Sequence, residues 1–237
     1  MGLSSLATYR AAFEVTGIEI VEEKLFGFDV VDFAPVVSAC LAKNPDILCW
    51  DTAYPDYVTL MTEQAFLQGF QGKFVSCTLD QYPNVIDKSS QEFVEGFIFQ
   101  FPDFDDPMMQ GPDINFANAA EFYRIYQEKY PGAWNAVSWE YAGILESWKR
   151  GVELAGSYEP LDVLEALKGM ETFPHVFGPA KWWGKDFFGV DNAPIGRWPV
   201  VQMQNGKAVI VEMANVMAWL EQHQDVLYRH FKDLNMV

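Results

Sequence analysis

Hydrophobic residues in the first hundred positions follow two alternating spacings, one typical of helices and one typical of strands. Apolar side chains recur every three to four residues in segments that predict helices, namely 3–15, 32–41 and 55–69. Short apolar runs predict strands at 18–26, 47–50, 73–77 and 93–101. This alternation predicts an α/β fold in which a parallel sheet is flanked by helices.

The pattern changes at about residue 102. A loop rich in proline and aspartate, FPDFDDPMMQGPDIN, is followed by segments of helical periodicity with little strand signal between them, at 116–130, 137–155 and 160–169. Two later runs flank Asn205-Gly206, a dipeptide that strongly favours a two-residue hairpin. The chain then ends in an amphipathic helix predicted over about 214–234.

Composition narrows the classes of protein that fit. With 237 residues, half of them hydrophobic, the chain can bury a core in one large or two small domains. No apolar run reaches the roughly 20 residues of a membrane span, and the amino terminus lacks the pattern of a signal peptide. A net charge of -17 disfavours nucleic acid and anionic lipid as partners.

Several catalytic and metal-binding patterns are missing from the sequence. The three cysteines lack metal-ligand spacing and are expected to be buried free thiols, which leaves the redox compartment open. The acidic run PDFDDP lacks the spacing and closing glutamate of a calcium loop. There is no P-loop, GxSxG, HExxH or paired-cysteine motif, so we expect neither a metal nor a cofactor.

The order of landmarks resembles one family. In sequence these landmarks are GLSSLATYRAAFEVTGIEI, DVVDFAPVVSACLAKNPDILCW, YPDYVTLMTEQAFLQGF, KFVSC, VEGFIF, AVSWEYAGILESW, EPLDVLEAL, FGPAKWWG and PVVQMQNGKAVIV. The set is similar to the type I periplasmic solute-binding proteins of ABC transporters, in the group that binds branched-chain amino acids (Leu/Ile/Val).

The resemblance implies two α/β lobes that close around a ligand. Residues 1–101 and 191–237 would form the second lobe, and 102–190 would supply helices of the first lobe. The amino-terminal half of the first lobe, together with the opening strand of the second, would precede Met1. A periplasmic or other extracytoplasmic location is implied, with a small-molecule ligand and the membrane subunits of an ABC transporter as partners.

Candidate ligand-binding residues follow the predicted strands, because ligands of open α/β sheets bind outside the carboxyl ends of the strands. The first strand-end loop supplies Trp50, Asp51, Thr52, Ala53 and Tyr54. Thr78 and Asp80 follow the next strand, and Trp139 opens a helix of the second half. Rings offer apolar walls and cation-π faces, while hydroxyls and carboxylates orient polar groups.

Each candidate also has a purely structural interpretation. Trp50 fits a core position, Tyr54 fits helix packing, and Asp51 and Asp80 fit helix caps or turns. Trp139 lies in a periodic helix and is a core candidate as well.

Two positions depart from the family pattern. Where amino acid binders of the group place an aromatic residue, this chain has Ala53 with Tyr54 next to it. Where they place a carboxylate for the ligand ammonium, it has Thr78, with Asp80 two residues later. These departures argue against a branched-chain amino acid as the ligand.

The resemblance favours a function in solute binding for an ABC-type importer. The chain would close by a hinge motion around a small polar metabolite that is amino-acid-like or aromatic. A ligand-sensing domain of a receptor or regulator would have the same fold. A hydrolase using Asp51 or Asp80 lacks a nucleophile-base pair, so no enzyme is expected.

The sequence is also compatible with another function, that of a truncated module that binds a partner protein. Helices of residues 116–155 would then expose apolar faces and form a homodimer. The aromatic residues expected on those faces are Phe116, Tyr123, Tyr126, Tyr141 and Trp148.

Overall fold

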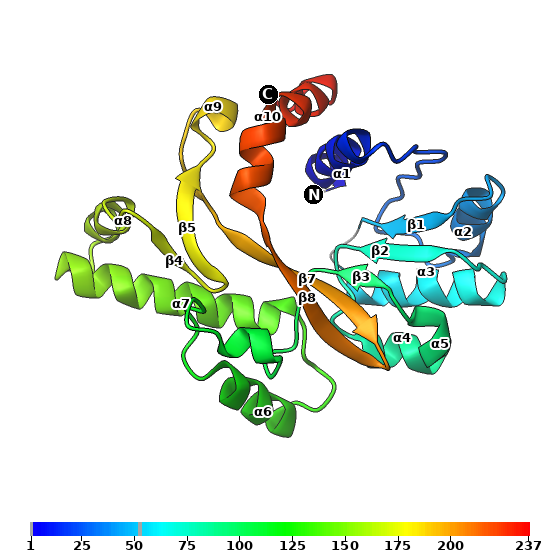
Figure 1. The fold of residues 1–237 in the computed structure, drawn as a ribbon, viewed down its shortest axis with the longest axis horizontal. Coiled ribbons are helices and arrows are strands. Elements are labelled where there is room, and N and C mark those ends of the chain that lie inside the picture. The colour runs from blue at the N-terminus through cyan, green and yellow to red at the C-terminus, as the bar shows by residue number, and fades with distance from the viewer. Residues whose placement is uncertain (1, 52–53) are drawn as a thin grey trace. The chain divides into compact units, whose positions relative to one another are not determined.

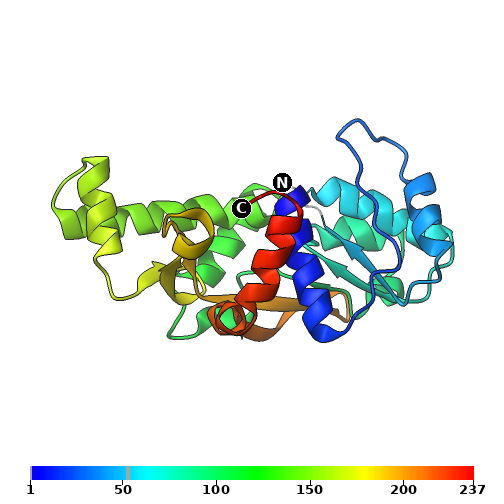
Figure 2. The same cartoon turned by 90° about the horizontal axis from the view of Figure 1, so that it is seen from above.

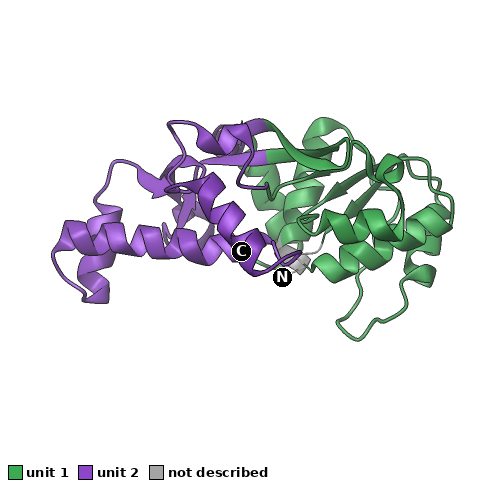
Figure 3. Ribbon diagram, turned by 90° about the horizontal axis from the view of Figure 1, so that it is seen from below, with its two compact units in different colours: residues 1–102, 200–211, 223–237 green, residues 103–199, 212–222 purple. Residues whose placement is uncertain are grey.

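Two compact units make up the part of the chain that the structure describes. The structure is a computed structural model, and it describes residues 2–51 and 54–237. The first unit comprises Met1–Pro102, Val200–Val211 and His223–Val237, and the second comprises Asp103–Pro199 and Glu212–Gln222 (Figure 3). The assignment of residues to the two lobes of a larger binding protein stays a prediction.

The first unit is built on three short parallel strands. β1 (Ile47–Trp50) pairs with β2 (Lys73–Ser76), which pairs with β3 (Ile98–Phe99), as the alternating pattern predicts. β3 then pairs antiparallel with β7 (Arg197–Gln204), so the full order is β1-β2-β3-β7-β8 with β8 at Lys207–Asn215. A mixed sheet flanked by helices is thus observed (Figure 1).

Helices lie against both faces of this sheet. α3 (Pro55–Leu67) covers one face, where the indole N–H of Trp50 donates to the Thr62 hydroxyl at 3.1 Å. α1 (Gly2–Thr16) lies over the other face, where the Tyr9 hydroxyl forms a hydrogen bond with the Cys49 thiol (Figure 1). The remaining helices of the unit are α2 (Ala34–Leu41), α4 (Tyr82–Lys88) and α5 (Gln91–Val94).

Two strand predictions were wrong in whole or in part. Residues 18–26 form no strand, and within the described residues β1 pairs only with β2. A strand requires a neighbour for its backbone hydrogen bonds, so an alternating pattern alone does not fix one. The strand predicted over 93–101 shortens to β3, because the Ser90 hydroxyl accepts the Phe93 N–H at 3.1 Å and begins the helix α5.

The hairpin prediction is confirmed by the backbone. Asn205 and Gly206 both have positive φ, at 52° and 76°, as a type I′ turn between neighbouring strands requires.

The last helix, α10, spans Val216–Asp233, and its part within the first unit lies beside α1 (Figure 2). Glu14 of α1 accepts hydrogen bonds there from Arg229 and His230, the latter at 2.9 Å.

The second unit combines the predicted helices with a sheet that the sequence did not reveal. Its helices are η1 (Pro107–Gln110), α6 (Ala119–Lys129), α7 (Ala136–Ala155), α8 (Pro160–Lys168) and α9 (Lys185–Phe188). Its three-stranded sheet has the order β4 (Phe173–His175), β5 (Gly178–Trp183) and β6 (Ala193–Ile195). Each of these short strands contains or borders a proline, which weakens the strand signal.

Aromatic rings fill the core of the second unit. Phe104 is fully buried and contacts Phe116, Trp134 and Trp139, with ring centroids 4.9–5.4 Å apart. Phe177 extends the cluster at 5.1 Å from Trp139. Phe116 is therefore buried, and the prediction that it lies on an exposed helix face was wrong.

None of the described helices is both long enough and apolar enough to cross a membrane.

Candidate functional site

The carboxyl ends of β1 and β2 meet at one edge of the sheet in the first unit. Their register pairs Trp50 with Ser76, and the Cys77 N–H donates to the Trp50 carbonyl at 3.1 Å. The Ser76 hydroxyl lies 3.1 Å from the Trp50 carbonyl oxygen and 2.7 Å from that of Thr78. These contacts fix the loops that follow the two strands, so the polar side chains in them are held in place.

Thr78 and Asp80 form a buried pair after β2. The Thr78 hydroxyl donates to Asp80 Oδ1, and both residues are less than 5 % exposed. Burying a carboxylate is unfavourable unless hydrogen-bond donors replace the lost water, and the Thr78 hydroxyl supplies one such donor. The pair thus presents an oriented carboxylate at the strand end.

Asp51 follows β1 and is half-buried. Burial raises the pKa of its carboxyl above the ordinary value, and a hydrogen bond from Ser5 of α1 acts in the opposite direction. A partly desolvated carboxylate with raised pKa is typical of groups that gain from binding a cation.

Tyr9 of α1 completes the buried polar contacts at this edge. Burial raises the pKa of the Cys49 thiol to about 12, although the hydrogen bond from Tyr9 acts to lower it. Burial also raises the pKa of the Tyr9 phenol well above its ordinary range. The Cys77 sulfur accepts a hydrogen bond from the Gln100 amide at 3.1 Å. A thiol that stays protonated, like that of Cys49, is neither a nucleophile nor a metal ligand.

The tryptophans occupy the structural positions that the sequence left open. Trp50 is buried and bonded to Thr62, and Trp139 is buried among Phe104 and Phe177 in the second unit. Their roles in ligand binding stay predictions. Thr52 and Ala53 lie outside the described residues.

Tyr54 belongs to an aromatic group beside the strand-end loop. Its ring lies 5.5 Å from the rings of Phe28 and Tyr57, and Tyr57 lies 5.2 Å from Phe33. Tyr54 and Phe28 are exposed, so they could offer an apolar surface to a ligand.

Sequence reasoning missed three residues at this edge, namely Phe28, Ser5 and Tyr9. The spacing of Ser5 and Tyr9 places them on one face of α1, which is a signal that could have paired them. No sequence signal links Phe28 to Tyr54.

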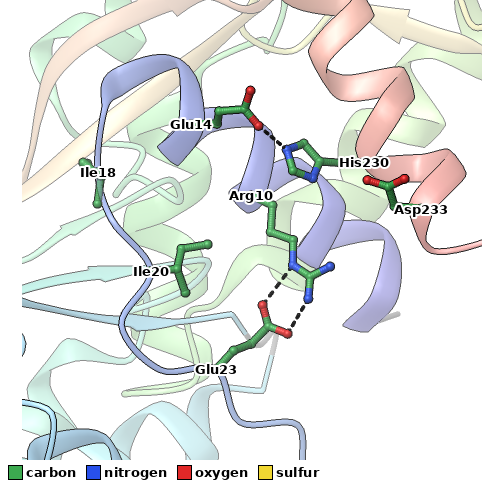
Figure 4. Close-up of a pocket in the computed structure, with 7 residues that line it drawn as sticks. All are labelled: Arg10, Glu14, Ile18, Ile20, Glu23, His230 and Asp233. Atoms are coloured by element: carbon green, nitrogen blue, oxygen red, sulfur yellow. Dashed lines mark hydrogen bonds and ion pairs between the residues drawn. The ribbon is translucent and has the colours of Figure 1, made fainter.

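A separate pocket of about 550 Å³ lies between α1, the segment after it and α10 (Figure 4). Its lining residues are Arg10, Glu14, Ile18, Ile20, Glu23, His230 and Asp233. Arg10 binds both carboxylate oxygens of Glu23, at 2.6 and 3.0 Å, and Glu14 binds His230. Because these charges are engaged with one another, we assign the pocket a structural role in joining α1 to α10.

Among the described residues, histidine, cysteine and acidic side chains form no group of three or more that could hold a metal ion.

Comparison with known proteins gives one family. A family model described as "Periplasmic binding protein" matches residues 1–208. A search of curated proteins finds no match.

Three solved structures illustrate the likeness of the fold. A leucine-binding protein from Thermotoga maritima is 19% identical with a TM-score of 0.60, and the match covers 92% of this chain and 66% of that one. A branched-chain amino acid ABC transporter protein from Thermus thermophilus with bound valine is 15% identical with a TM-score of 0.62, covering 92% and 59%. A solute-binding protein of an ABC transporter from Rhodopseudomonas palustris HaA2, in complex with p-hydroxybenzoic acid, is 15% identical with a TM-score of 0.62, covering 90% and 57%.

The chain thus spans 57–66% of the length of these structures. Family members are substrate-binding proteins and not enzymes, and the family is periplasmic. On the match over residues 1–208, the chain belongs to the periplasmic binding protein family.

Proposed function

We propose that this chain captures a small polar metabolite outside the cytoplasm and serves an ABC-type importer through its membrane subunits. Capture would involve hinge closure, in which ligand binding shifts an equilibrium between open and closed forms. Membership of the periplasmic binding protein family supports this role.

The buried pair of Thr78 and Asp80 is the observation that carries the proposal. The pair holds a buried carboxylate in a fixed orientation at the end of a parallel strand, where ligands of open α/β sheets bind.

The side chains at this edge favour a ligand with a positively charged group. Asp51 and Asp80 are both acceptors when ionised, and the Thr78 hydroxyl that donates to Asp80 can still accept a hydrogen bond. An ammonium group complements two carboxylates, whereas a bare carboxylate would be repelled. Together with the exposed rings of Tyr54 and Phe28, this favours an amino-acid-like ligand with an apolar or aromatic side chain.

Isothermal titration calorimetry with a panel of amino acids and with 4-hydroxybenzoate tests the proposal. We expect one or more amino acids to bind, and 4-hydroxybenzoate to bind at least tenfold more weakly. Asp80→Asn should weaken amino acid binding at least tenfold, which corresponds to about 1.4 kcal/mol. Asp87→Asn, on the exposed surface of α4, is the matched control and should leave affinity within about twofold.

Asp51→Asn provides a second variant in case Asp80→Asn disturbs folding. Equal affinities for wild type, Asp51→Asn and Asp80→Asn would contradict the site. Binding of 4-hydroxybenzoate in preference to every amino acid would contradict the ligand class.

A further inference from the structure

One side of α7 carries a continuous apolar stripe that the second unit leaves uncovered. Its residues recur at the three- and four-residue spacing of a single helix face, and each is between 48 % and 65 % exposed. They are Val137, Tyr141, Ile144, Leu145 and Trp148. We call them the α7 stripe.

The opposite side of α7 already has its partners. Trp139 and Gly143 are buried, and a Cβ added to Gly143 would lie 2.6 Å from the Val176 side chain. Beyond the stripe, towards the end of α7, Gly151 packs as closely against Val163 and Leu167 of α8. The α7 stripe is therefore a second apolar face of a helix whose first face is already packed.

The aromatic residues of α6 differ from those of the stripe. Tyr123 and Tyr126 are only half-exposed and pack on Trp134, with ring centroids at 4.7 and 5.5 Å. Tyr141 and Trp148 remain exposed, and Tyr158 continues the surface at 6.3 Å from Trp148. The available apolar surface thus lies on α7 and not on α6.

We propose that the α7 stripe is the contact surface for a second copy of this chain, with the two α7 helices packed antiparallel about a twofold axis. The part of the stripe from Tyr141 to Trp148 has its midpoint between Ile144 and Leu145. An antiparallel pair centred there brings Tyr141 of one copy opposite Trp148 of the other, so the surface is complementary to itself. By helical periodicity Glu140 lies beside the stripe and Glu146 lies on the opposite side of the helix, so no like charges meet at the centre of the stripe.

The area of the stripe fits such a dimer. Since a large aromatic side chain buries roughly 150–250 Å² when fully covered, the stripe with Tyr158 offers about 700 Å² of exposed apolar surface per copy. A specific interface buries about 800 Å² per partner, and the largest apolar patch of a monomer is typically about 300–600 Å².

Sedimentation equilibrium of the full chain between about 1 and 100 µM tests the proposal. We expect a monomer–dimer equilibrium, and Leu145→Glu should raise the dimer dissociation constant at least tenfold. The matched control is Leu67→Glu on α3, because Leu67 is 65 % exposed and Leu145 is 64 % exposed. The control should leave the constant within about twofold.

Salt dependence gives a second readout. Two chains of net charge -17 repel each other, and salt screens that repulsion, so raising NaCl should strengthen an apolar dimer. A wild-type chain that stays monomeric over the whole concentration range would overturn the proposal. A dimer that Leu145→Glu and Leu67→Glu affect equally would also overturn it.

Discussion

At the scale of single residues, polar groups are held in buried positions at the ends of β1 and β2. The Asp51 carboxyl is partly desolvated, Asp80 is buried against Thr78, and Cys49 is a protonated thiol beneath Tyr9. Burial disfavours the charged form of Asp51, so this carboxyl has a cost in the ligand-free protein that a bound cation could offset.

Asp51→Asn should stabilise the empty protein near neutral pH. Burial raises the pKa of Asp51 in the folded state, so the folded protein binds this proton more tightly than the unfolded chain does. Stability from this group is therefore present at low pH and is lost as pH rises from the unfolded pKa through the folded pKa. The gain at pH 7 should be less than about 1 kcal/mol, because partial exposure screens the group.

Urea unfolding of wild type and Asp51→Asn at pH 3.5 and 7 measures this effect. The difference between the two proteins should be larger at pH 7 than at pH 3.5. A variant less stable than wild type at pH 7 would show that Asp51 makes net favourable contacts in the empty protein.

Trp50→Phe should destabilise the first unit by about 1–2 kcal/mol, because it leaves the buried Thr62 hydroxyl without its indole donor. Thr62→Val alone should cost a similar amount, and the double variant should cost less than the sum. Urea unfolding of the four proteins measures the coupling. Strict additivity would mean that the Trp50–Thr62 bond adds nothing to stability.

At the scale of elements, the β7–β8 hairpin and the α1–α10 contact hold distant parts of the chain within the first unit. The hairpin turn is anchored where the Asn205 N–H donates to Glu95 at 2.9 Å. Leu227 and Phe231 of α10 are buried, although they follow the region matched by the family model.

Gly206→Ala should destabilise the hairpin by about 1–2 kcal/mol. Gly206 has a φ of 76°, which disfavours a Cβ, and the added atom would meet the Gln91 side chain at 2.7 Å. Gly111→Ala is the control, because Gly111 has a negative φ and its nearest contact is at 3.4 Å. Thermal unfolding that ranks the two variants equally would contradict the turn geometry.

Phe231→Ala should destabilise the first unit by about 3 kcal/mol, because it removes a buried ring and leaves a cavity. Tyr228→Ala on the same helix should cost under about 1 kcal/mol, since Tyr228 is 41 % exposed. Denaturant unfolding compares the two. A small effect at Phe231 would mean that α10 does not dock on this unit in solution.

Most elements could be predicted from periodicity because their signals are local. Pro55 begins α3 and Asn205-Gly206 forms the turn, as expected from backbone preferences alone. Residues 18–26 show the limit, since their alternating pattern is real but a strand also depends on a partner that local sequence does not specify.

The part of the candidate site that lies at the strand ends could also be predicted from the sequence. Asp51 and Asp80 could be predicted because strand ends in a parallel sheet share an edge. The contribution of α1, through Ser5 and Tyr9, depends on how a helix packs across the sheet, and no local pattern encodes that packing.

At the scale of the whole molecule, family membership and fold agree while the length differs from that of the solved relatives. The family model matches residues 1–208, and the chain covers 53–66% of the similar structures. We propose that this chain holds a small ligand at the carboxyl ends of β1 and β2.

Native mass spectrometry of the purified chain tests for this bound ligand. We predict a bound small molecule, carried through purification or taken up from a bacterial metabolite extract, that Asp80→Asn loses and Asp87→Asn retains. A chain that binds nothing from the extract, or an Asp80→Asn variant that keeps the same molecule, would show that the ends of β1 and β2 do not bind a ligand through Asp80.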